Sequence, residues 1–207
     1  MGLILLILSI LSPLLPIITG KHNRKEPLWM YSFLCFTTDL TELVLKEEFH
    51  FNLTEIAHIT LLIEIVSFYY YFYKRSVIPT RIAFWIITSI AVIFYILHTL
   101  FSISWHQLNT GGYSVVLMSY ILLSMLGFRN ILHNQRTKYI GTSAFFWGNT
   151  AIMVYACGAF FIFLFKDKVY SVNAELFGQL WIYGYLTFYI TKNLLLGVAL
   201  AKNRTVE

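Results

Sequence analysis

The 207-residue chain is 58% hydrophobic and only 12% charged, whereas a soluble domain has about 25% charged residues. This composition excludes a water-soluble fold, and the length leaves no room for a soluble domain beside a membrane bundle. The net charge of +5 is not gathered into a long Lys/Arg run, so we expect a lipid bilayer and no nucleic acid as the partner.

Seven segments are apolar and long enough to cross a bilayer, which requires about 20 helical residues. Because lipid cannot hydrogen-bond a bare backbone, each of these segments is expected to be a helix. We therefore predict an all-α, polytopic membrane protein with one domain spanning residues 1–207. Its seven transmembrane helices are expected at about 2–19, 28–45, 51–73, 82–104, 113–133, 144–165 and 176–200.

Local sequence features refine these segments. The first has no basic residue ahead of it and no small-residue cleavage site after it, so we predict a retained helix, kinked at Pro13 and Pro16. Gly111 and Gly112 are expected to form a turn before the fifth helix. The Phe68–Tyr73 run precedes Lys74 and is expected in the interfacial aromatic belt.

Basic residues predict the orientation, because cytoplasmic loops carry an excess of Lys and Arg. Twelve basic residues lie on or near one side and three on the other, which predicts an outside N-terminus, a cytoplasmic C-terminus and a plasma or inner membrane location. The three are Lys46, Lys166 and Lys168, and the twelve are Lys21, Arg24, Lys25, Lys74, Arg75, Arg81, Arg129, Arg136, Lys138, Lys192, Lys202 and Arg204.

Five ionisable residues on the second, third and fourth predicted helices fall in one layer near the outer boundary. Asp39 and Glu42 are three residues apart, as are Glu55 and His58, so each pair shares a helix face. With His98, they predict an outward-facing polar cavity that binds a small ligand, proton or ion. Carboxylate and imidazole groups also suit zinc or another first-row metal, for which Asp39, Glu55, His58 and His98 are the candidate ligands. A structural polar network and solvated helix ends are the alternatives.

A second polar layer is expected towards the cytoplasm. Glu64 has no cation beside it on its own helix, and a carboxylate at this depth requires a partner. Lys192 and Arg129 are the expected cations, and Asn149 is the other candidate. For the two cations, the alternative is that their side chains extend to the headgroups.

Together these features favour a membrane protein that senses or transports a small ligand, proton or metal ion. A sensor of this size would require a separate cytoplasmic signalling effector. The alternative is a membrane-embedded, metal-dependent enzyme of hydrolase type, although zinc hydrolases with seven helices need histidines that the last helix lacks. Retinal is not expected on Lys192, because Phe188 stands where microbial rhodopsins carry an acid. No nucleophile elbow or phosphate-binding glycine loop is present.

Overall fold

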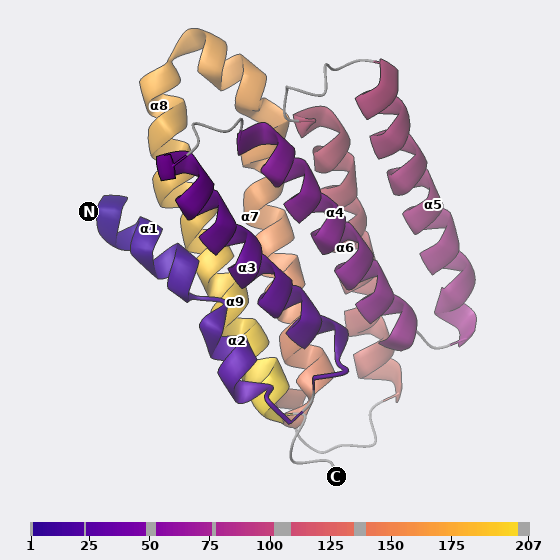
Figure 1. Ribbon diagram of the computed structural model, residues 1–207. Helices are drawn as coiled ribbons and strands as arrows, with labels where there is room; N and C mark the ends of the chain where they lie inside the picture. The colour runs from indigo at the N-terminus through magenta and orange to yellow at the C-terminus, as the bar shows by residue number, and fades with distance from the viewer. Residues whose placement is uncertain are drawn as a thin grey trace.

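The computed structural model describes residues 2–22, 24–48, 53–75, 78–101, 109–134 and 140–202. Within these ranges the chain is almost entirely helical and contains no strand. Long helices lie side by side in an elongated bundle, and successive long helices run in opposite directions (Figure 1). The all-α prediction is confirmed.

Two prolines shape the first segment. It consists of α1 (Gly2–Leu11) and α2 (Leu14–Thr19), which are separated at Ser12 and Pro13. Proline has no N–H to continue the helical ladder, so the chain bends there. The Ser12 hydroxyl donates to the Ser9 carbonyl at 2.9 Å and accepts from Asn193 Nδ2 at 2.7 Å. The kink predicted at Pro13 is therefore present and held by polar contacts, whereas Pro16 lies inside α2 without interrupting it.

The remaining helices follow the apolar segments closely. The last segment is continuous but includes a π-helical stretch, η2, between α8 and α9. The elements are α3 (Pro27–Glu48), α4 (Leu53–Arg75), α5 (Ile78–Phe101), α6 (Thr110–Asn134), the 3-10 turn η1 (Ile140–Thr142), α7 (Ala144–Val172), α8 (Ala174–Gln179), η2 (Leu180–Tyr185) and α9 (Leu186–Lys202).

Five helical segments are long and apolar enough to cross a membrane, which supports a membrane protein. α3 and α4 fall outside this set, in a search of the described residues only. These two helices carry many of the ionisable residues singled out above, including Asp39 and Glu64. The five spans are Gly2–Thr19, Arg81–Phe101, Thr110–His133, Ala144–Lys166 and Ala174–Lys202.

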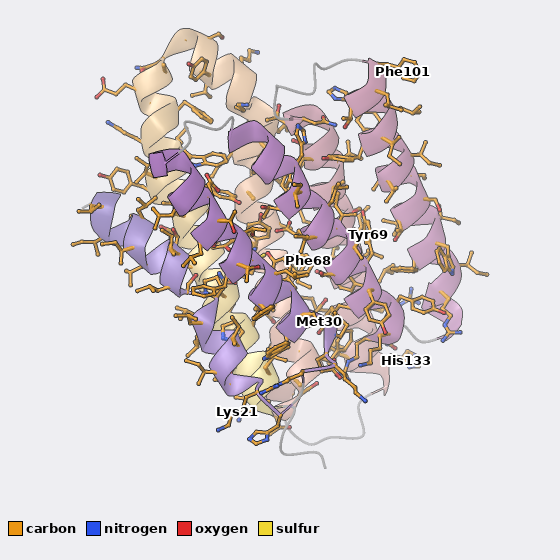
Figure 2. The ribbon with its side chains drawn as sticks, in the orientation of Figure 1. Lys21, Met30, Phe68, Tyr69, Phe101 and His133 are labelled. Carbon is orange, nitrogen blue, oxygen red and sulfur yellow. The ribbon has the colours of Figure 1, made fainter. Side chains whose placement is uncertain are left out.

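The packing order places α7 and α9 at the centre of the bundle. α7 packs against both α6 and α9, α9 also packs against α2, and α3 packs against α4. α5 lies at one edge beside α6 (Figure 1). Its outer face exposes large apolar side chains, with Phe101 81% exposed; Figure 2 shows Phe101 at the end of the bundle opposite Lys21. An apolar exposed face of this kind fits a lipid environment.

Two local expectations require correction. α7 continues through Lys166 and Lys168 to Val172, because no Gly or Pro follows Phe165 before Asn173, whose side chain caps α8 by accepting from Leu176 N at 2.9 Å. The Gly111–Gly112 pair lies inside the first turn of α6 instead of forming a loop turn.

The aromatic run on α4 packs largely inside the bundle. Phe68, Tyr69, Tyr71 and Phe72 are buried in the core, and the position of the run at the membrane interface stays a prediction. A helical run of six aromatics presents side chains to every direction, and the face towards α3 and α6 is buried.

A substitution at Gly158 can test how closely α7 and α9 approach each other. A Cβ built there would lie 2.2 Å from the Phe188 ring, whereas one at Gly178 meets nothing within 4 Å. We expect Gly158→Ala to lower the stability by about 1–3 kcal/mol through overpacking. Gly178→Ala is the control and should be neutral or stabilising by up to about 1 kcal/mol. Thermal unfolding in detergent measures both, and equal effects would contradict the packing described.

Candidate functional site

The described core contains a buried ion pair between α4 and α9. The Lys192 ammonium lies 3.4 Å from Glu64 Oε2, and the two side chains are 0% and 5% exposed. Glu64 is the middle residue of α4, and the pair lies in the interior of the bundle. Charges at such a position are tolerated only when they are paired and hydrogen-bonded.

Two tyrosine hydroxyls complete the coordination of the Glu64 carboxylate. Tyr31 on α3 donates to Oε2 at 3.0 Å, and Tyr113 on α6 donates to Oε1. Lys192 in turn donates to the Tyr31 hydroxyl. Each of these side chains is fully or almost fully buried. The carboxylate therefore has three donors from three other helices, as a buried charge requires.

A row of hydroxyl groups leads away from Glu64. The Tyr113 hydroxyl lies 3.0 Å from that of Tyr155, which lies 3.4 Å from that of Tyr185. Because the Tyr113 hydrogen is directed at Glu64, Tyr155 must donate to Tyr113, and Tyr185 to Tyr155. We call the six connected residues the Glu64 network. They are Tyr31, Glu64, Tyr113, Tyr155, Tyr185 and Lys192.

The far end of this row is less enclosed than its centre. Tyr185 is half-buried and is the last residue of the π-helical stretch η2. Its ring stacks on Trp181, with centroids 4.4 Å apart. Single-turn π-helical insertions are rare and often occur at functional sites. The row of hydroxyls thus joins the buried carboxylate to a half-buried side chain on an irregular part of the last segment.

Aromatic rings surround the Lys192 ammonium. The nitrogen lies 3.9 Å from the Tyr155 ring centroid, 4.3 Å from that of Tyr189 and 4.9 Å from that of Tyr31, with Phe68 at 5.8 Å. Ring faces at these distances stabilise a cation electrostatically, most strongly where water is excluded. We call these four rings the aromatic cage. They come from four different helices, α3, α4, α7 and α9.

Asp39 adjoins the cage from α3. The Tyr189 hydroxyl donates to Asp39 Oδ2 at 2.9 Å. Asp39 is only half-buried, and Glu42, one turn further along α3, is half-buried as well. Two carboxylates thus adjoin the cage: Glu64 contacts the Lys192 ammonium, and Asp39 contacts the hydroxyl of a cage tyrosine.

His98 has a different environment from Asp39. Its Nδ1 lies 2.7 Å from Asn109 Oδ1, which also accepts from Gly112 N at 2.8 Å and so caps α6. A Cβ at Gly111 would lie 3.0 Å from the His98 ring. The glycine therefore allows the imidazole to lie against the start of α6, and His98 connects α5 to α6. The described contacts do not bring His98 together with Asp39.

His58 and Glu55 complete the five residues predicted for the outer layer. His58 is buried on α4, at 2% exposure. The side chain of Glu55 lies outside the described part of the chain. Among the described residues, no three His, Cys, Asp or Glu side chains form a group that could hold a metal ion. The metal site stays a prediction.

Arg129 and Asn149, the other residues predicted to serve Glu64, have different positions. Arg129 is exposed on α6 and lines an open surface hollow with His133. Asn149 is fully buried on α7, where its amide donates to the Ser124 carbonyl at 2.9 Å. Of the predicted partners, the described contacts bring only Lys192 to Glu64.

Sequence reasoning missed the tyrosines, although they make most of the contacts to the pair. Tyr31, Tyr113, Tyr155 and Tyr189 lie within helices and are buried; Figure 2 shows Phe68, a cage member, in the middle of the bundle. Tyrosine away from the interface of an apolar segment requires a polar partner for its hydroxyl. This requirement for a polar partner was the signal in the sequence that could have identified these tyrosines as site residues.

Comparison of the chain with protein-family models, curated proteins and solved structures found no match. The candidate function therefore depends on the geometry of the site.

A double-mutant cycle tests whether Glu64 and Lys192 are coupled. Glu64→Gln and Lys192→Met should each destabilise the protein by about 3–5 kcal/mol, because each leaves the other charge buried without its partner. The double variant should be less destabilised than the sum of the two by at least about 1 kcal/mol. Unfolding measured in the same detergent provides all three values, and additive effects would contradict a direct pair.

Proposed function

We propose that the chain crosses the membrane seven times, with its N-terminus outside and its C-terminus in the cytoplasm. α3 and α4 then span the membrane together with the five apolar spans, and their polar side chains face the protein interior. The excess of basic residues at one end supports this orientation. At that end Lys74 and Arg75 bond to Glu26, at 3.0 and 3.7 Å.

Cysteine labelling tests this orientation. Asn173→Cys lies between α7 and α8, and Lys21→Cys follows α2; both positions are exposed. A membrane-impermeant maleimide applied to intact cells should label Asn173→Cys, and should label Lys21→Cys only after the membrane is opened. The unsubstituted protein, with Cys35 buried and Cys157 partly buried, is the background control. The reverse pattern would contradict the orientation.

The function that the site supports best is sensing or transport of a small cation, with the proton as the simplest candidate. The observation that carries this proposal is the fully buried Glu64–Lys192 pair, from which hydroxyl groups lead to the half-buried Tyr185. A charged pair in an apolar core is a functional feature by default in membrane helices. It is not needed for packing, since apolar residues of similar size are often neutral or stabilising there.

The Glu64 network supplies a route for a proton. While Glu64 is charged, the hydroxyl hydrogens of Tyr113, Tyr155 and Tyr185 are all directed towards it. When Glu64 accepts a proton, its attraction for Lys192 and for the Tyr31 hydroxyl weakens, because both bonds depend on its charge. Protonation would therefore loosen contacts among α3, α4, α6 and α9 together. Such a rearrangement gives a transporter its change of access, or a sensor its signal to a cytoplasmic effector.

The alternative function predicted from the sequence is a metal-dependent enzyme, and the described contacts support it less. It requires Asp39, Glu55, His58 and His98 around one metal ion, and the side chain of Glu55 lies outside the described part of the chain. Asp39 is hydrogen-bonded to Tyr189, and His98 to Asn109 at the start of α6. The Asp39 contact instead places this carboxylate beside the cage that holds Lys192.

A matched pair of tyrosine substitutions tests the proton response. Tyr113→Phe removes a hydroxyl from the Glu64 network, whereas Tyr69→Phe removes one that bonds Ser119 at 2.6 Å, also between α4 and α6. Proton uptake by proteoliposomes measures transport, and the pH dependence of tryptophan fluorescence measures sensing. Tyr113→Phe should reduce the response by about tenfold, since a hydrogen bond to a charged group contributes about 1.5–3 kcal/mol.

Tyr69→Phe should leave the response within about twofold of the unsubstituted protein, because it keeps every bond of the Glu64 network. Equal responses from the two variants would contradict the proposal. So would an unsubstituted protein that shows neither proton uptake nor a change of fluorescence with pH.

A further inference from the structure

The aromatic cage has the composition of a binding site for an organic cation. Ring faces from Tyr31, Tyr155 and Tyr189 lie within 5 Å of one nitrogen, and the Glu64 carboxylate lies beside it. Proteins use this combination to recognise ammonium groups, because several ring faces and an anion together replace the water around the cation. Here the cation is the chain's own Lys192.

A second carboxylate adjoins the cage. The Tyr189 ring faces the Lys192 ammonium at 4.3 Å, and its hydroxyl donates to Asp39 Oδ2 at 2.9 Å, while Glu64 contacts the ammonium itself. Glu64 already has hydroxyl donors in Tyr31 and Tyr113 that do not depend on Lys192. The Glu64 carboxylate therefore keeps two of its hydrogen-bond donors when the Lys192 ammonium leaves it.

Asp39 offers the Lys192 ammonium an alternative carboxylate partner. The ammonium is carried by a flexible four-carbon stem, and Asp39 is reached across the Tyr189 ring, whose hydroxyl donates to it at 2.9 Å. Asp39 is half-buried, so this position is closer to water than Glu64 is. Movement of the ammonium from Glu64 to Asp39 would open the cage without leaving a buried charge alone.

We propose that the aromatic cage binds a small organic ammonium ion, which takes the place of the Lys192 ammonium beside Glu64 while Lys192 moves to Asp39. This inference depends on the proposed cation function, and names the class of ligand. The ligand is a free ion and not a lipid headgroup, because all four rings of the cage are buried in the core of the bundle, where a headgroup attached to its lipid would not reach. Entry is from the side of Asp39 and Tyr185, the half-buried residues next to the cage.

Thermal unfolding of the full chain in detergent tests this inference. The probes are methylammonium and tetramethylammonium chloride, compared with sodium chloride at equal ionic strength. Either probe should raise the melting temperature saturably, since a ligand that binds the folded state stabilises it by mass action. Lys192→Ala removes the competing ammonium and should lower the apparent Kd of that probe by about tenfold or more.

Three variants test whether the rise in melting temperature arises from binding of the probe in the aromatic cage. In the Lys192→Ala background, Glu64→Gln and Tyr155→Leu should abolish the shift, whereas Tyr155→Phe, which keeps a ring, should retain it. Tyr69→Phe, outside the cage, should change nothing.

The inference is overturned if neither probe produces a saturable shift relative to sodium, or if the shift survives Glu64→Gln. A proton response that depends on Tyr113, together with no binding of either probe, would overturn this inference alone. If the protein instead shows no proton response but binds a probe saturably and in a Glu64-dependent way, the cage stays an organic-cation site. The proton is then not the transported or sensed ion.

Discussion

Burial of the Glu64 and Lys192 charges is the constraint on which the rest of the bundle depends. Transfer of either ion from water into an apolar core costs several kcal/mol, and the attraction between them repays this only with additional hydrogen bonds. Tyr31 on α3 and Tyr113 on α6 donate to Glu64 directly, and Tyr155 on α7 bonds to the Tyr113 hydroxyl. The register of at least five helices is thereby fixed around one point. Close approach at Gly158 lets α7 and α9 meet where this arrangement requires it.

Amide side chains hold the bundle together away from this centre. Asn109, at the start of α6, donates to the Tyr95 carbonyl of α5, Asn193 connects α9 to the bend between α1 and α2, and Asn149 connects α7 to α6. These neutral contacts do not depend on a charge that a proton can remove. The Glu64–Lys192 pair does depend on such a charge, because protonation of the Glu64 carboxylate removes its attraction for the Lys192 ammonium. The described core therefore combines neutral connections between helices with a buried contact that depends on charge.

The sequence predicted the helices well and the site only in part. Long apolar segments must be helical in lipid, so the all-α fold followed from composition, and Pro13 indicated the bend. Lys192 could be named as a partner for Glu64 because a carboxylate inside an apolar helix requires a cation. Depth along separate helices, however, does not determine which faces meet, so Asp39 and His98 were grouped although their contacts differ. The tyrosines were overlooked because their spacing within a helix does not reveal the direction of a hydroxyl.

The central claim is that the Lys192 ammonium contacts the Glu64 carboxylate in the membrane-embedded protein. Solid-state NMR can measure the dipolar coupling between lysine ¹⁵Nζ and glutamate ¹³Cδ atoms in protein labelled at both and reconstituted in lipid. From the described residues we expect a contact-range signal of the exposed Glu26–Lys74 pair, which both variants keep, and another that both Glu64→Gln and Lys192→Met remove. A spectrum that the two substitutions leave unchanged would contradict the pair, and with it the proposed function.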